Sequence, residues 1–98
     1  MEFGTRLLHN GNEVDPHTGA ASIPVYLAST YHQFDPARPG RFDYARSGNP
    51  TRLALERTIA ELEGGVRGFA FSSGMAAIST VFLLFSAGDH LVVSRDVY

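Results

Sequence analysis

The chain has 98 residues, of which 44% are apolar and 11% aromatic, so its composition fits a small folded domain and excludes a disordered tail. A net charge of -2 with scattered basic residues excludes the positive surface that attracts nucleic acid or anionic lipid. The absence of cysteine excludes disulfides and cysteine-based zinc sites and fits a reducing compartment. The longest apolar run, Val81–Phe85, is too short to cross a bilayer. We therefore expect a soluble, cytoplasmic protein with no nucleic-acid or membrane partner.

The basic residues are all arginines. All eight members of the Lys+Arg count are Arg, so the chain contains no lysine and cannot form a Schiff base on its own side chains. The four histidines show no metal-binding spacing and are predicted to be structural or exposed. No metal site is expected.

Residues 1–48 are rich in turn-forming residues and contain only short apolar pieces. Turn-forming pairs interrupt the apolar pieces, and no helical or strand periodicity is sustained. These pairs are Asn10-Gly11, Asp15-Pro16, Asp35-Pro36 and Pro39-Gly40. A compact domain rarely contains such a long irregular stretch unless the stretch lies on another surface or carries function. We predict an extended arm.

The pattern becomes helical after Asn49. Asn49 suits the N-cap and Pro50 the first helical position, and apolar residues recur at helical spacing until Gly64-Gly65. One amphipathic helix is predicted between these signals.

The rest of the chain reads as strand, helix, strand. Residues 66–72 and 90–94 are short and apolar, as buried strands are, and a helix with apolar residues on nearly every side is predicted from Ser73-Gly74 to Gly88. Such a unit of about 30 residues implies an α/β fold with a parallel sheet. Because a parallel sheet needs further strands to cover its faces, we expect the chain to be a truncated piece of a larger unit.

The Ser-Ser-Gly turn between the first strand and its helix is a candidate anion site. A helix N-terminus leaves amides unpaired and carries partial positive charge, so the amides of Gly74 and Met75 could bind a phosphate. The simpler interpretation is that Ser72 or Ser73 only caps the helix. The turn has neither the Walker A nor the G-x-G-x-x-G pattern, which argues against an ordinary nucleotide site.

Two further positions could assist such a site. In "DYARSGNPTR", Tyr44 and Arg46 lie on the same side of an extended segment, where a phenol and a guanidinium fork could grip one anion. A surface arginine beside a half-buried tyrosine is the alternative. Tyr98 follows the second predicted strand, at the edge where open parallel sheets bind ligands, and its ring could stack on a planar cofactor. The alternative is a frayed chain end.

Taken in order, "DYARSGNPTR", "FSSGMAAI" and "SRDVY" resemble the beginning of the Cys/Met-metabolism family of pyridoxal-phosphate (PLP) enzymes, and the resemblance extends from about Thr5 to Tyr98. It implies a fold-type I, aspartate-aminotransferase-like domain with a mostly parallel sheet. Residues 1–48 would be an arm that contacts a neighbouring subunit, and residues 49–98 the beginning of the large PLP-binding domain. A homotetramer built from dimers is also implied.

The resemblance also implies roles for individual residues. Tyr44 and Arg46 would reach the cofactor phosphate of the neighbouring subunit, while Gly74 and Met75 would bind the phosphate within their own subunit through main-chain amides. Tyr98 would stack on the pyridine ring and take part in catalysis. The implied cofactor is pyridoxal 5'-phosphate, and the implied substrate is a sulfur amino acid of the cystathionine or O-acyl homoserine class.

The implied reaction is C–S bond elimination or γ-replacement of the cystathionine β-lyase or γ-synthase type. Because the chain has no lysine, we expect the parent protein to be an enzyme and the 98-residue chain alone to be inactive. Two alternatives remain at this point. The chain could be a non-catalytic assembly piece, or it could be a small α/β domain that binds another phosphate ester.

Overall fold

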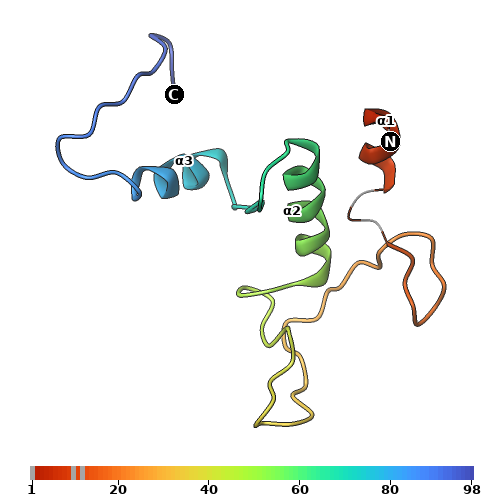
Figure 1. Ribbon diagram of the computed structural model, residues 1–98. Coiled ribbons are helices and arrows are strands. Elements are labelled where there is room, and N and C mark those ends of the chain that lie inside the picture. The colour runs from red at the N-terminus through yellow and green to blue at the C-terminus, as the bar shows by residue number, and fades with distance from the viewer. Residues whose placement is uncertain (1, 10, 12) are drawn as a thin grey trace.

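A computed structural model describes residues 2–9, 11 and 13–98. Within these residues it contains three α-helices and no strand: α1 (Phe3–His9), α2 (Pro50–Leu62) and α3 (Gly74–Phe82). Figure 1 shows α1 beside α2, whereas α3 lies apart from both and leads into a long C-terminal segment. In the part of the chain that the structure describes, no helix combines the length and apolar character needed to cross a membrane.

Helix α2 confirms the prediction from the sequence. The side-chain oxygen of Asn49 accepts from the amide of Thr51 at 2.8 Å, and Pro50 occupies the first helical position. At the other end, the amides of Gly64 and Gly65 donate back to carbonyls of the last turn at 3.3 and 2.7 Å, which is the Schellman arrangement. Gly64 has φ +66°, a conformation that glycine adopts without steric cost.

The arm is more structured than predicted, because α1 was not expected from its sequence. A helix of seven residues is unstable by itself, and this one lies against α2, where Arg6 donates to the backbone carbonyl of Glu61. This tertiary contact explains why the local sequence did not reveal α1. The turn predicted at Asn10 lies outside the described residues.

The middle of the arm folds back on itself. Thr30 and Tyr44 form an isolated antiparallel bridge, and the amide of Tyr31 donates to the carbonyl of Asp43 at 2.9 Å. The side chain of Gln33 spans the same loop by donating to the carbonyl of Phe42 at 2.8 Å. The segment that carries Tyr44 is therefore held by backbone pairing.

The two predicted strands are not confirmed by the described residues. Neither 66–72 nor 90–94 forms a ladder, because a strand exists only by pairing with a neighbour and neither segment has one. Helix α3 starts where predicted but ends at Phe82 instead of Gly88, and the next amides donate three residues back, as in a tightened last turn. None of the residues of α3 is buried, although apolar residues occupy nearly every side of the helix.

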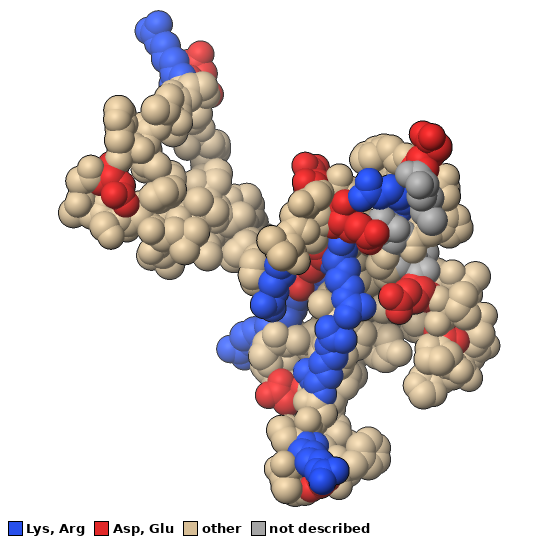
Figure 2. All heavy atoms as spheres, in the orientation of Figure 1, with Lys and Arg blue, Asp and Glu red and all other residues tan. Residues whose placement is uncertain are grey.

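The chain exposes far more surface than a compact protein of its mass. Its accessible area is 8403 Å², against about 5,500 Å² expected for a folded monomer of this size, and its radius of gyration is 17.6 Å instead of about 13 Å. Ala54 is the one buried hydrophobic residue among those described. Figure 2 shows that charged residues gather over α2 and the arm, whereas uncharged residues cover most of the part around α3.

Candidate functional site

Tyr44 and Arg46 lie together as predicted, but the segment that carries them is a turn and not the extended segment that was expected. The Nη2 nitrogen of Arg46 donates to the phenolic oxygen of Tyr44 at 3.2 Å, and the guanidinium carbon lies 5.2 Å from the centroid of the ring. Because the phenol accepts this bond, its own O–H remains available as a donor. The pair thus presents a cation and a hydroxyl donor to the same side, and no carboxylate within the described residues pairs with Arg46. This arrangement suits an oxyanion.

The turn that carries the pair is built around Asp43. One oxygen of its carboxylate accepts from the Ser47 hydroxyl at 2.8 Å and from the Tyr44 amide at 2.7 Å. These bonds, with that from Ser47 the stronger influence, hold the pKa of the Asp43 carboxyl below its ordinary value. The amides of Ser47 and Gly48 both donate to the carbonyl of Tyr44, at 3.0 and 2.9 Å. The backbone around Tyr44 is therefore well fixed.

Arg52 connects this turn to α2. Its Nη1 donates to the carbonyl of Ala45 at 2.9 Å, and its Nη2 donates to the carbonyl of Arg46 at 3.2 Å. Sequence reasoning assigned no role to Arg52. The signal that could have revealed it is the helical i, i+4 spacing to Glu56, whose carboxylate lies 3.9 Å from Nε of Arg52.

Glu56 in turn holds the segment that follows α2. The same carboxylate oxygen accepts from the amide of Ala70 at 3.0 Å. The backbones approach closely here, since a Cβ on Gly68 would lie 2.3 Å from the carbonyl oxygen of Glu56. Residues 66–72 thus lie against α2 and lead directly into the Ser73–Met75 turn.

The turn before α3 combines both roles considered for it. Ser73 caps the helix, with its hydroxyl accepting from the amide of Ala76 at 3.1 Å. Within the described residues, the amides of Gly74 and Met75 have no hydrogen-bond acceptor. Nothing lies within 4 Å of a Cβ placed on Gly74. Capping and two free donors therefore coexist in an open, exposed turn.

The structure does not bring the three candidate regions together in one chain. The loop that contains Tyr44 and Arg46 lies at the N-terminal end of α2, whereas α3 follows the C-terminal end, and the C-terminus lies beyond α3 (Figure 1). Tyr98 is fully exposed, and no contact to it is found within the described residues. A site built from all of them requires residues from outside a single copy of this chain.

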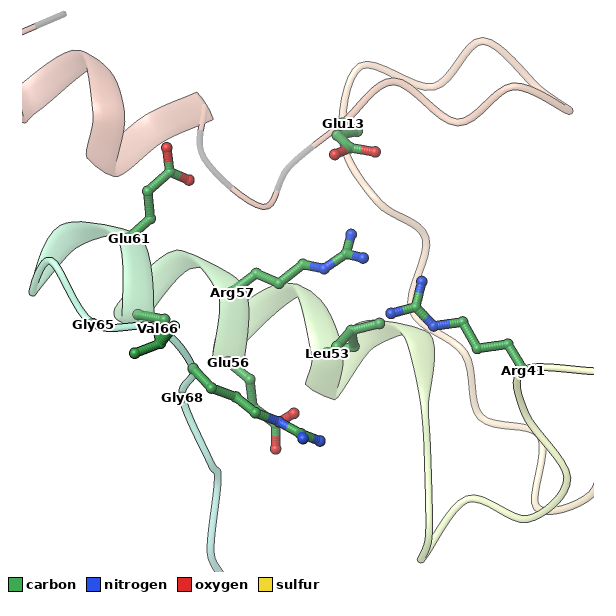
Figure 3. A pocket seen from close by; sticks show the side chains of 11 residues that line it. Glu13, Arg41, Leu53, Glu56, Arg57, Glu61, Gly65, Val66 and Gly68 are labelled. Atoms are coloured by element: carbon green, nitrogen blue, oxygen red, sulfur yellow. The ribbon is translucent and has the colours of Figure 1, made fainter.

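A pocket of the described part lies elsewhere. It has a volume of about 780 Å³ and lies along α2 next to residues 65–68. In Figure 3 the guanidinium groups of Arg41 and Arg57 point toward one another across it, and Glu56 projects from α2. None of the site residues predicted from the sequence lines this pocket, and its width reflects the open shape of the chain. No cluster of metal ligands occurs among the described residues.

Comparison with known proteins decides the family. Residues 4–98 match the profile of the Cys/Met metabolism PLP-dependent enzymes. The chain belongs to this family. Among curated relatives, it is 63% identical over 94 residues to cystathionine beta-lyase of Bacillus subtilis and 52% identical over 94 residues to cystathionine gamma-synthase of Haemophilus influenzae. These alignments cover 96% of this chain but 24% and 26% of the relatives, so the chain spans about a quarter of their length.

Solved structures of such enzymes share its fold. The structure of cystathionine gamma-lyase from Lactobacillus plantarum complexed with L-serine superposes with a TM-score of 0.81 at 56% identity, over 92% of this chain and 23% of that one. For cystathionine gamma-lyase from yeast the TM-score is 0.78 at 41% identity, over 88% of this chain and 22% of that one. These matches support the predicted fold-type I architecture for the part of it that this chain covers.

The cofactor of this family is pyridoxal 5'-phosphate, and the described residues fit its phosphate group. A phosphate needs several donors and positive charge. The chain offers two free amides at the start of α3, and the paired donors Arg46 and Tyr44 on its arm. Among the described residues, no carboxylate is hydrogen-bonded to the side chains of Arg46 and Tyr44 or to the two amides. A bound phosphate would therefore meet no competing negative charge there.

Proposed function

We propose that this chain is the N-terminal part of a longer PLP-dependent enzyme that acts on sulfur amino acids, of the cystathionine β-lyase or γ-synthase type. The chain is 63% identical to a cystathionine beta-lyase and 52% identical to a cystathionine gamma-synthase, which supports both types of activity. The substrate would be cystathionine or an O-acyl homoserine. Residues 1–48 serve as the arm, and residues 49–98 begin the large domain.

The observation that carries the proposal is the Arg46–Tyr44 pair, which presents two donors outward with no carboxylate bound to it in the described structure. Gly74 and Met75 bind the cofactor phosphate through their amides in the same subunit. Arg46 and Tyr44 bind the phosphate held by a neighbouring subunit, because the pair lies apart from the turn of its own chain (Figure 1). A dimer with shared sites, paired into a tetramer, meets this requirement.

Tyr98 would hold the ring of the cofactor, and its phenol would hold or move a proton. When bound, the cofactor supplies the electron sink that stabilises negative charge on the substrate. This chain's residues would hold the phosphate and orient the ring. The chain has no lysine, so the lysine that attaches the cofactor comes from the rest of the enzyme, and the 98-residue chain alone is inactive.

A hybrid-subunit experiment tests the shared site. Full-length subunits with Arg46→Ala are mixed with full-length subunits with Met75→Pro, and cofactor content and cystathionine cleavage or synthesis are measured. Each parent variant is expected to lose cofactor. A hybrid dimer combines the intact turn of one subunit with the intact pair of the other, so about half of its sites recover. If hybrids recover no site while each parent variant is deficient, the pair and the turn act within one subunit, and the cross-subunit assignment is wrong.

A further inference from the structure

We propose that Arg52 and Glu56 are positioning residues for the phosphate site. Arg52 fixes the loop of Arg46, and Glu56 fixes the segment that leads to the Ser73–Met75 turn. This inference rests on the proposed function, because it assigns the supports of the same donors. Helix α2 would then support both parts of the site. It would hold the Arg46–Tyr44 pair, which serves a neighbouring subunit, and the Ser73–Met75 turn, which serves its own subunit.

The first step is the contact of Arg52 with the loop. Its two terminal nitrogens donate to the carbonyls of two consecutive residues, Ala45 and Arg46, at 2.9 and 3.2 Å. The guanidinium therefore holds the very backbone from which the Arg46 side chain projects. A planar fork can do this with two fixed bonds, whereas a lysine ammonium offers a single point charge.

The second step is the contact of Glu56 with the opposite segment. Its side chain is 18% exposed, compared with 33% for that of Arg52. One carboxylate oxygen accepts from the Ala70 amide at 3.0 Å, while Nε of Arg52 lies 3.9 Å away. A charge-assisted bond to a backbone amide is stronger than a neutral one. Since Ala70 lies three residues before Ser73, Glu56 sets where the turn begins.

A plain surface ion pair along α2 would be the simpler interpretation of these two residues. Exposed i, i+4 pairs contribute little, and the 3.9 Å separation of Arg52 and Glu56 is long. The bonds that each residue makes to backbone outside α2 are shorter than their mutual contact. Their main role is therefore to join α2 to the two segments, and their mutual attraction is secondary.

The test measures PLP affinity of the full-length holoenzyme after removal and re-addition of cofactor. Arg52→Ala and Arg52→Lys are expected to weaken binding by about tenfold and several-fold respectively, on the scale of one lost hydrogen bond to a charged group. Glu56→Gln is expected to weaken it several-fold. Arg38→Ala and Glu63→Gln are matched controls, because neither side chain makes a hydrogen bond or ion pair in the described structure, and both are expected to bind PLP like the wild type.

A double variant separates positioning from general destabilisation. If Arg52 acts through Arg46, Arg52→Ala added to Arg46→Ala weakens binding by twofold or less, since the residue that it positions is already gone. A full tenfold effect in that background would overturn the inference, as would wild-type affinity of both Arg52 variants. If Arg46→Ala itself binds PLP normally, the proposed function fails instead. Should Arg52→Ala not fold, Arg52→Lys provides the same comparison.

Discussion

The side-chain amide of Asn49 donates to the carbonyl of Tyr26 at 3.0 Å while its oxygen caps α2. One residue thus starts the helix and ties the arm to it. A second tether runs beside it, since the hydroxyl of Thr51 donates to the carbonyl of Pro24 at 3.0 Å and accepts from the amide of Tyr26 at 2.9 Å. The arm is therefore anchored at the N-terminus of α2.

The two functions of Asn49 can be separated by substitution. Asn49→Ala removes the cap and the tether, which together are expected to cost about 2 kcal/mol in the free energy of unfolding. Asn49→Asp keeps a capping oxygen but loses the donor to Tyr26, so about 1 kcal/mol is expected. Urea denaturation of the full-length protein measures both. Equal losses in the two variants would show that the cap contributes nothing.

Arg46→Ala is expected to weaken cofactor retention in the full-length protein by about 1.5–3 kcal/mol, the usual contribution of a hydrogen bond to a charged group. Fluorescence titration of the cofactor-free protein with PLP gives the dissociation constant. Tyr44→Phe removes the hydroxyl but keeps the ring beneath the guanidinium, so a smaller loss is expected. Unchanged PLP affinity in both variants would contradict the assignment of this pair.

Met75 is proposed to act through its backbone amide. Substitution by alanine and by proline should therefore have different effects on PLP affinity. Met75→Ala retains the amide and is expected to leave PLP affinity nearly unchanged. Met75→Pro removes the donor at a position in the first helical turn, where the helix itself does not need it, so PLP affinity falls while helix content is kept. Circular dichroism checks the helix. Tight PLP binding by the proline variant would exclude this turn as the phosphate site.

The turn around Asp43 is expected to depend on pH in the acid range. Its pKa is below the ordinary value of 3.8, so its stabilising contribution is fully present above that value and is lost as the pH falls through the lower folded pKa. Ser47→Ala removes the larger cause and should move the titration midpoint of Asp43 upward, toward 3.8. Carbon-13 NMR of the carboxyl group measures the midpoint. A midpoint that stays in place would show that Ser47 does not stabilise the carboxylate.

Gly68 and Gly4 form a matched pair of alanine substitutions. A Cβ at position 68 would meet the carbonyl oxygen of Glu56 at 2.3 Å, whereas nothing lies within 4 Å of one at position 4. Gly68→Ala must therefore push residues 66–72 away from α2 and weaken the bond between Glu56 and Ala70. We expect it to lower the melting temperature of the full-length protein, and Gly4→Ala to leave that temperature unchanged. The reverse order would contradict the close approach.

The features predicted correctly from the sequence are those with a local cause. Asn49, Pro50 and Gly64 act through bonds within a few residues, so α2 could be predicted at both ends. The cap at Ser73 is equally local. Tyr44 and Arg46 were predicted to meet along an extended segment, whereas they meet across a local turn at residues 45–47.

The features that were missed or wrong depend on contacts distant in sequence. Helix α1 needs α2, and the strands predicted at 66–72 and 90–94 need partners that the described chain does not provide. The role of Arg52 depends on carbonyls six and seven residues earlier in the chain, across a turn whose shape could not be predicted from composition. The positions of the site residues remain predictions where they concern a neighbouring subunit.

The uncovered α3 has a consequence for how the polypeptide is handled in the cell. Phe82, the last residue of α3, and Leu83 and Leu84 directly after it are 49%, 83% and 81% exposed, and bare apolar surface of this kind promotes aggregation until it is covered. In a full-length protein, other residues would have to cover this apolar surface to protect the polypeptide from aggregation. Expression yield would then report on the speed of folding as well as on stability.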